Sequence, residues 1–264
     1  MNDVKILGRF FWYDLMTSDP AAARVFYANV IGWSMQPWGP PEGAYTMVAN
    51  AEGPVGGIAE LGKDESSVPL GPPHWLAYVG TPDIDATVEQ AKALGGKVLV
   101  PVTEIPTVGR FAVLADPQGA VFAPFTPASS TPGMPERSAD APGRFSWHEL
   151  HTSEPDAGYA FYSELFGWGQ TGEMDMGPMG LYRMFGQTPD RSLGGVMTTT
   201  HQAPVPGWTC YITVADIKGT LDRVRANEGQ VVYGPDEVPG GDLVAACIDP
   251  QGAAFAVFQK AAVR

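Results

Sequence analysis

Cysteine and basic residues are both scarce in this 264-residue sequence. It has two Cys, and its 16 Lys and Arg stand against 29 Asp and Glu, which gives a formal charge of -13 and a pI near 4.6. A surface of this sign repels phosphate backbones and anionic lipids, so neither nucleic acid nor a membrane is an expected partner. Cys210 and Cys247 fall in strand-like runs, where we expect two buried free thiols rather than a disulfide.

Long apolar runs are absent as well. No stretch approaches the ~18 residues that a membrane-spanning helix needs, and the N-terminal residues MNDVKILGRFFWYDL lack the apolar core of a signal peptide. We therefore expect a soluble protein of the cytoplasm. The sequence also has no P-loop, no GxGxxG after a strand, and no CxxC, HExxH or GxSxG, so the sites that these motifs build are not expected.

Material for a core and for turns is abundant. Hydrophobic residues make up 44% of the chain and charged residues 17%, which is typical of a globular protein. The 32 Gly and 25 Pro indicate many turns and short strands rather than long helices. The length suits two domains of roughly 100–150 residues each.

The chain is an internal duplication. Residues 8–33 recur at 143–168 with roughly half of the positions identical, and DPQGAVFAPF at Asp116 recurs as DPQGAAFAVF at Asp249. The segment between the halves is rich in Pro, Ser and Ala, which is typical of a linker. We therefore predict a first domain at 1–128, a linker at 129–141 and a second domain at 142–264, and we expect each half to fold alone.

Each half also has an internal order of strands and helices. In the first half, FFWYDLMT (10–17) alternates as a strand, and residues 18–20 supply a cap and an early proline for a helix that ends at Gly32. After further strands the pattern restarts with the strand HWLAYVG (74–80) and a helix at 83–94. The unit strand–helix–strand–strand–strand occurs twice per half, which predicts an α+β fold of four modules.

These segments resemble the vicinal-oxygen-chelate superfamily, which includes glyoxalase I, bleomycin-resistance proteins and extradiol dioxygenases. The likeness rests on a strand ending in T-S-D-P or T-S-E-P, a following helix with F-Y that closes in G-W, the D-I-D-A-T-V helix start at Asp83, and the DPQGA turns. It is greatest to a two-domain actinobacterial group labelled 27-kDa antigen-like or hydroxylase. The resemblance implies that each half pairs two βαβββ modules into an open, U-shaped barrel of eight strands around a small-molecule cavity.

The enzymes of this superfamily hold a divalent metal in the cavity, so the resemblance also implies where its ligands would lie. The equivalent positions here are Trp12, Leu76, Ala123, Trp147, Thr209 and Ala256. None of them offers the imidazole nitrogen or carboxylate oxygen that divalent ions prefer. The chain has only four His, which are His74, His148, His151 and His201. We expect no metal and no other cofactor.

Tryptophans and acids stand in place of ligands in the first strand of each half. Residues two apart on a strand share a face, so Asp14 shares a face with Trp12. By the same spacing, Glu149 and His151 share a face with Trp147. An indole supplies a flat apolar wall and a carboxylate supplies an acceptor or a base, a combination that suits a flat polar aromatic molecule or a cation. We predict the three polar residues as catalytic candidates and the two tryptophans as ligand-binding residues.

Three further residues are ligand-binding candidates. Trp75 and Trp208 begin the second module of each half and are placed to close the opposite wall. Arg110 has Asp242 as its counterpart in the second half, so it can anchor an anionic ligand in the first cavity only.

Structural roles stay open for all of these residues. A strand tryptophan is often part of a core, and the Asp14 and Glu149 carboxylates can bond to backbone or pair with an arginine such as Arg9, Arg144 or Arg110. His151 has Met16 as its counterpart and can be a tolerated substitution. His148 has the opposite parity and is expected to face outward. His74 is expected to lie in a loop or to begin a strand rather than to be a ligand. The Gly pairs 56–57 and 194–195 are expected to form a bulge or bend.

Three hypotheses of function follow from these residues. The first is a metal-free module that binds a small aromatic molecule, such as an antibiotic or secondary metabolite. The second is a metal-free acid/base enzyme, an isomerase, lyase or hydroxylase-like protein acting on a polyketide-type substrate. The third is a metal-dependent lyase or dioxygenase with unusual ligands, such as Glu149 with His151. The partner is a small molecule in each case, and the chain is expected to be a monomer with pseudo-symmetric halves or a homodimer.

Overall fold

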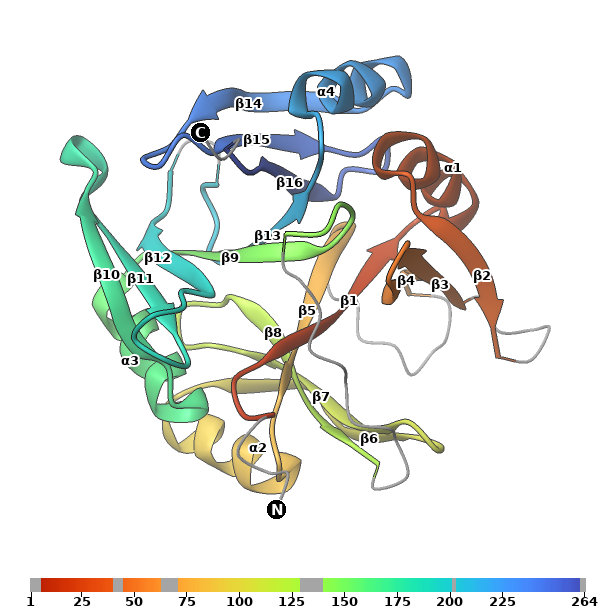
Figure 1. Ribbon diagram of the computed structural model, residues 1–264. Coiled ribbons are helices and arrows are strands. Elements are labelled where there is room, and N and C mark those ends of the chain that lie inside the picture. The colour runs from red at the N-terminus through yellow and green to blue at the C-terminus, as the bar shows by residue number, and fades with distance from the viewer. Residues whose placement is uncertain (1–5, 40–44, 63–70, 129–139, 201–202, 262–264) are drawn as a thin grey trace. The chain divides into compact units, whose positions relative to one another are not determined.

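The computed structural model describes residues 6–39, 45–62, 71–128, 140–200 and 203–261. His201 and most of the predicted linker lie outside these residues. The strands form two eight-stranded sheets, one from each half of the sequence (Figure 1). Neither sheet closes into a barrel within the described residues, because the two strands at its ends do not pair with each other. The predicted α+β class with tandem modules is confirmed.

The first sheet has the strand order β2-β3-β4-β1-β5-β8-β7-β6, and the second has the equivalent order β10-β11-β12-β9-β13-β16-β15-β14. The strands of the first sheet are β1 (Phe10–Thr17), β2 (Ser34–Trp38), β3 (Tyr45–Asn50), β4 (Gly53–Glu60), β5 (His74–Gly80), β6 (Lys97–Ile105), β7 (Gly109–Ala115) and β8 (Val121–Pro127). Those of the second sheet are β9 (Phe145–Thr152), β10 (Gly169–Asp175), β11 (Leu181–Gly186), β12 (Gly194–Thr198), β13 (Gly207–Thr213), β14 (Gln230–Glu237), β15 (Leu243–Ile248) and β16 (Ala254–Gln259).

One long helix follows the first strand of each module. The four are α1 (Pro20–Ile31), α2 (Ile84–Ala93), α3 (Pro155–Phe166) and α4 (Ile217–Ala226), and a short 3₁₀ turn, η2, spans Gly177–Met179. The predicted caps are confirmed for α1, where the Asp19 carboxylate accepts from the Ala22 amide and Gly32 ends the helix at φ 85°. Within the described residues, the helices are all too short or too polar to cross a membrane.

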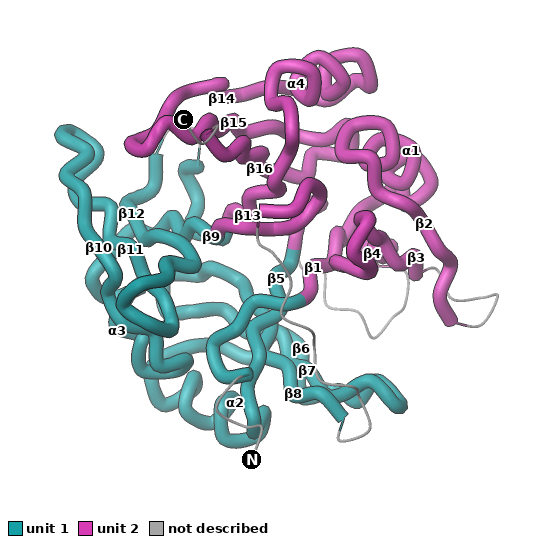
Figure 2. The backbone as a smooth tube through the Cα atoms, viewed as in Figure 1, with its two compact units in different colours: residues 1–11, 76–135, 148–208 teal, residues 12–75, 136–147, 209–264 magenta. Residues whose placement is uncertain are grey.

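The chain forms two compact units, and each unit combines segments from both halves of the sequence (Figure 2). Unit 1 contains residues 1–11, 76–135 and 148–208, and unit 2 contains residues 12–75, 136–147 and 209–264. The first module of one half therefore belongs with the second module of the other. The predicted domain boundaries follow the duplication, and they stay a prediction.

Buried hydrogen bonds explain this combination of modules. In unit 2, the Tyr27 hydroxyl donates to Asp249 at 3.1 Å and accepts from the Trp75 indole N–H at 3.0 Å. In unit 1, Tyr162 bonds to Asp116 and Trp208 with the same two distances. The Trp–Tyr–Asp relay thus occurs once per unit, and each relay joins an F-Y helix of one half to the DPQG turn of the other.

The repeated G-W and G-R-F segments form a second pair of links between the halves. The Trp33 indole donates to the Gly143 carbonyl at 2.9 Å in unit 2, and the Trp168 indole donates to the Gly8 carbonyl at 2.8 Å in unit 1. Both glycines have φ above 70°, and a Cβ at either one would collide with the indole nitrogen. The segments that carry the family resemblance therefore build the core.

The two cysteines are buried free thiols, as predicted from the sequence. Cys210 is on β13 and Cys247 is on β15. Burial raises the pKa of each thiol to about 12, so neither is a thiolate near neutral pH.

Candidate functional site

The first candidate site lies on one face of β1 and β3 in unit 2. The Asp14 carboxylate oxygen Oδ1 accepts from the Trp12 indole at 3.0 Å and from the Tyr45 hydroxyl at 2.7 Å, and the indole nitrogen lies 2.8 Å from that hydroxyl. Asp14 itself is only 8% exposed. Burial, with the nearby Asp14 charge, raises the pKa of Tyr45 far above its usual value, so its hydroxyl remains protonated and donates.

A glycine makes room for this phenol. Gly57 on β4 is the register partner of Asp14, and a Cβ at residue 57 would overlap the ring and hydroxyl of Tyr45. The register of β3 against β4 shifts near Gly56, which agrees with the predicted bulge. Gly57 has a different role, which is to leave space for the Tyr45 ring. Gly195 of the second half, opposite Glu149, makes the same room for Tyr182.

The second candidate site lies on β9 and β11 in unit 1. The Glu149 carboxylate accepts from the Tyr182 hydroxyl on Oε2 at 2.9 Å, and its Oε1 lies 2.8 Å from the His151 Nε2. The side chains of Glu149 and His151 are 13% and 10% exposed. The structure therefore brings two of the predicted catalytic residues into direct contact, and it adds a tyrosine that sequence reasoning missed.

The other nitrogen of His151, Nδ1, has a different environment. Nδ1 is buried and, within the described residues, has no hydrogen-bond partner. A buried donor or acceptor without a partner costs about 1–3 kcal/mol, and the cost is larger when the group is charged. The neutral tautomer with its proton on Nε2 fits this environment best, and that N–H donates to Glu149.

Tyr45 and Tyr182 could have been found from the repeat itself. Each begins a Y-x-M segment, Tyr45-Thr46-Met47 and Tyr182-Arg183-Met184, that precedes the Gly pair of its half. The residues opposite these tyrosines on the neighbouring strand differ: Trp38 lies opposite Tyr45, and Met174 lies opposite Tyr182. Trp38 is 42% exposed and packs edge-on against Tyr45 with ring centroids 5.8 Å apart.

Trp75 and Trp208 lie within aromatic clusters. Trp75 is 7% exposed and packs against Tyr27, Trp33 and Phe145. Its indole N–H donates to the Tyr27 hydroxyl. The half-buried Trp208 has the equivalent bond in unit 1. These contacts favour a structural role for both residues. The half-buried Trp147 is on β9 two residues before Glu149, which places it on the same face of that strand.

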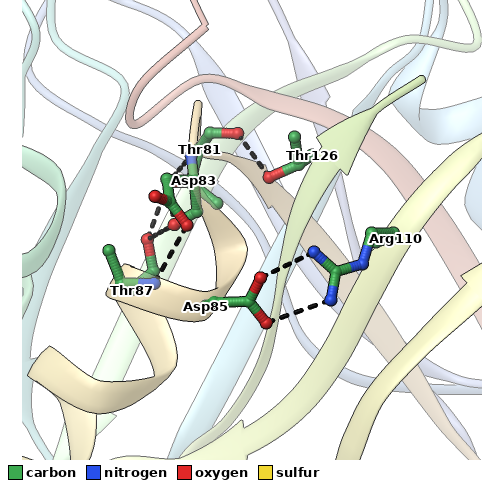
Figure 3. Close-up of polar contacts among 7 residues, drawn as sticks. Thr81, Asp83, Asp85, Thr87, Arg110 and Thr126 are labelled. Carbon is green, nitrogen blue, oxygen red and sulfur yellow. Dashed lines mark hydrogen bonds and ion pairs between the residues drawn. The ribbon is translucent and has the colours of Figure 1, made fainter. Parts of the chain in front are cut away.

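Arg110 is engaged at the surface (Figure 3). Its guanidinium binds both Asp85 oxygens, at 2.7 and 3.0 Å, and the two side chains are 45% and 63% exposed. The hydrogen bond from Arg110 lowers the pKa of Asp85. An anionic ligand would have to displace this carboxylate, so we do not include Arg110 in the site.

The expectation that His148 faces outward is wrong. His148 is 3% exposed, stacks on Phe10 with ring centroids 3.7 Å apart, and places Nδ1 2.9 Å from the Leu193 carbonyl. Its counterpart Tyr13 stacks in the same way on Phe145 in unit 2. The face of β9 opposite Glu149 is therefore core rather than solvent. His74 begins β5, as predicted.

The superfamily's metal positions do not suit a metal in this structure. Leu76 is 2% exposed, Ala123 and Ala256 are fully buried, and the Trp12 indole directs an N–H donor, not a lone pair, at its neighbours. Groups of three or more His, Cys, Asp or Glu arranged to hold an ion are absent from the described part of the chain. The residues present therefore do not fit the metal that the fold implies.

Comparison with known families gives a match across both halves. The model of the Glyoxalase/Bleomycin resistance protein/Dioxygenase superfamily matches residues 9–123 and again 144–257. The chain belongs to this superfamily. The sequence-based resemblance is thereby confirmed, and the two matches coincide with the two halves of the duplication.

Curated relatives within the superfamily span almost the whole chain. "Putative glyoxylase CFP32" of Mycobacterium tuberculosis is 31% identical over 257 residues, covering 95% of this chain and 94% of the relative. The anthracycline biosynthesis protein DnrV of Streptomyces peucetius is 29% identical over 264 residues, covering 94% and 92%.

Solved structures of the superfamily share the fold. The Mn(II)-bound glyoxalase from Novosphingobium aromaticivorans has a TM-score of 0.66 at 13% identity, covering 96% of this chain and 82% of that chain. The 2,3-dioxygenase LapB from Pseudomonas sp. KL28 has a TM-score of 0.66 at 14% identity, covering 97% and 94%. At these identities the likeness concerns the fold and not the chemistry.

Proposed function

We propose that the protein binds a small aromatic metabolite, of the polyketide type found in antibiotics, on the faces that carry Asp14 and Glu149, without a metal ion. The observation that carries the proposal is the duplicated pair of carboxylate and phenol, Asp14 with Tyr45 and Glu149 with Tyr182. The superfamily resemblance implies that the face of Trp12 and Trp147, which carries these pairs, lines the cavity, and this supports the proposal. The names of the relatives DnrV and DauV, both anthracycline biosynthesis proteins, support the ligand class.

The chemistry of the first site suits such a ligand. Trp12 and Trp38 offer indole surface for a flat ring system, and the Asp14 carboxylate accepts hydrogen bonds from phenolic hydroxyls or an amine. The hydroxyl of Tyr45 and the N–H of Trp12 hold the carboxylate in place before the ligand arrives. Groups that are already oriented lose less conformational entropy on binding, which favours affinity.

A fluorescence titration tests the proposal. Quinizarin, a flat dihydroxyanthraquinone, should quench the tryptophan emission of the wild-type protein. Asp14→Asn and Glu149→Gln keep shape and remove charge, and each should weaken its own site by about tenfold or more. Glu89→Gln is the matched control, because Glu89 is an exposed carboxylate on α2. If quinizarin, an anthracycline and bleomycin all leave the emission unchanged, the protein does not have this function.

Metal dependence is the alternative that the superfamily's solved enzymes favour. It would require Glu149 and His151 to act as ligands away from the usual positions. Elemental analysis of protein purified without chelators separates the two possibilities. We expect no stoichiometric Zn, Fe, Ni or Mn. Metal near one equivalent per half, retained through dialysis and lost in Glu149→Gln, would favour the alternative.

A further inference from the structure

Both candidate sites pair a carboxylate with a tyrosine, but the hydrogen-bond partners are distributed differently over the two carboxylate oxygens. Both donors of the first site, the Trp12 indole and the Tyr45 hydroxyl, bond to the same oxygen of Asp14. In the second site each oxygen of Glu149 has its own partner, Tyr182 on Oε2 and His151 on Oε1. His151 is the residue that creates this difference, because the equivalent position in the first half is Met16.

A neutral His151, the form that the unpartnered Nδ1 favours, leaves Glu149 usable as a base. A cation beside a carboxylate stabilises the negative charge and makes it a poorer proton acceptor. The buried, unpartnered Nδ1 opposes formation of that cation, since the added N–H would have no acceptor. His151 can therefore orient Glu149 through one neutral hydrogen bond without neutralising its charge.

Two methionines lie on the same sheet face as Tyr182. Met184 is two residues after Tyr182 on β11, so it shares the face of that tyrosine, and its methyl group lies over Gly172 of β10. Met174 is the cross-strand partner of Tyr182. Methionine side chains pack against flat rings of varied shape. Apolar cover also strengthens the electrostatic interactions of a carboxylate that is shielded from water.

We propose that Glu149 is the general base of a metal-free proton-transfer reaction in the second site, acting on an aromatic ketone with an acidic C–H next to its carbonyl. His151 is the positioning residue that holds the base. This inference rests on the proposed function, because the ketone must first bind to this face.

The step balances without a co-reactant. The Glu149 carboxylate takes the proton of the C–H bond, and the electron pair of that bond moves into the ligand, giving an enolate and a neutral carboxylic acid. The Tyr182 hydroxyl, no longer facing an anion on Glu149, can turn its hydrogen toward the enolate oxygen. The protonated Glu149 then exchanges its hydrogen with solvent. Delivery of the solvent hydrogen to the same carbon gives isotope exchange, and delivery to another carbon gives an isomer.

Hydrogen exchange of a model ketone tests the reaction. 2-Tetralone is a bicyclic aromatic ketone with acidic C1 hydrogens, and proton NMR in D₂O measures their loss. We expect the full-length wild-type protein to accelerate the exchange above the buffer rate, and Glu149→Gln to abolish the acceleration. Glu89→Gln should match the wild type. Circular dichroism melting checks that each variant is folded.

Variants of His151 separate positioning from a merely structural role. His151→Gln keeps an N–H donor within similar reach of Glu149, and it should retain most of the exchange rate. His151→Met, which copies the first half, should lower the saturated rate about tenfold or more while changing the half-saturating ketone concentration little. Equal loss in both variants, or none in either, would contradict the role of His151.

The outcomes also distinguish this inference from the proposed function. If 2-tetralone quenches tryptophan emission but exchanges at the buffer rate, the protein binds and does not catalyse, and the inference is wrong. If exchange is accelerated equally in Glu149→Gln, another group is the base and the inference is also wrong. If 2-tetralone does not bind at all, the substrate class is wrong, whereas the quinizarin titration decides the proposed function on its own.

Discussion

The Tyr27 hydroxyl in the first half of the chain donates to the Asp249 carboxylate in the second half, 3.1 Å away in a buried environment. The Asp249 carboxylate also accepts from the amides of Gln251 and Ala253, so one side chain organises the DPQG turn and anchors a helix of the other half. Tyr162 and Asp116 repeat the arrangement with the halves exchanged. Each half therefore needs a carboxylate that is supplied by the other.

Separated halves should not behave as independent domains. We expect fragments 1–132 and 138–264 to associate, either with each other or with a second copy of themselves, because each carries both the tyrosine and the carboxylate of a link. This replaces the simpler expectation that each half folds alone. Analytical ultracentrifugation of each fragment and of their mixture measures the association. Two monomeric fragments that each melt cooperatively would contradict this prediction.

Loss of the phenol that joins the halves should destabilise the fold without touching the ligand site. Tyr27→Phe removes the donor and leaves the Trp75 N–H and one Asp249 oxygen short of a partner, at a cost of about 1–3 kcal/mol in the free energy of unfolding. Tyr162→Phe should cost a similar amount in the other unit. Denaturant titration measures both. A loss well below 0.5 kcal/mol in both variants would show that the relays add little (~0.5 kcal/mol is the usual scatter for neutral changes).

Lowering the pH should reduce the free energy of unfolding, in part because His148 takes up a proton on unfolding. Burial lowers the pKa of His148 from 6.5 to about 4, so the folded state holds the neutral ring while the unfolded state takes up a proton. The resulting contribution to stability is complete above pH 6.5 and is lost as the pH falls from 6.5 toward 4. At pH 5 the loss should be about 2 kcal/mol.

His148→Tyr provides the comparison, because tyrosine occupies the equivalent position in the first half. The variant should lose less stability than the wild type between pH 7 and pH 5, as measured by urea denaturation at each pH. Parallel losses in the two proteins would show that other groups dominate the acid response.

A methyl group at residue 57 should disrupt the first site and spare most of the fold. In Gly57→Ala the new Cβ overlaps the Tyr45 ring, which must leave Asp14, so we expect weaker quinizarin binding and an altered Trp12 emission. Gly169→Ala is the matched control, since a Cβ there meets nothing within 4 Å and the residue has an ordinary backbone conformation. If the two variants bind quinizarin equally well, Tyr45 does not organise the site.

Much of the fold could be predicted because the duplication marks it twice. The helix caps and the strand sequences follow from local pattern, which needs no partner to interpret. The unsuitability of the six metal positions follows from the superfamily resemblance. The pairing of modules could not be predicted in the same way. Tyr27 has two DPQG turns available in the chain, with Asp116 or Asp249, and the two turns have nearly the same sequence. Only the packed structure selects between them.

The site residues on the first strand of each half could be predicted from the sequence, and those on other strands could not. Parity placed Asp14 with Trp12, but Tyr45 reaches them from a strand more than thirty residues later, and that contact depends on sheet register. Trp75 shows the converse limit. All but the first residue of β5 are buried, so alternation cannot distinguish a cavity face from a core face, and the core contacts of Trp75 emerge only from its partners.

The Trp–Tyr–Asp relays also affect how relatedness should be interpreted for proteins of this kind. A change at Tyr27 affects Asp249 in the other half, so we expect homologues that share this fold to retain the relay residues together. Two proteins can share every relay residue and bind different molecules. A change of ligand should instead alter the site positions that differ between the two halves of this chain. These positions are Trp38 with Met174 and Met16 with His151.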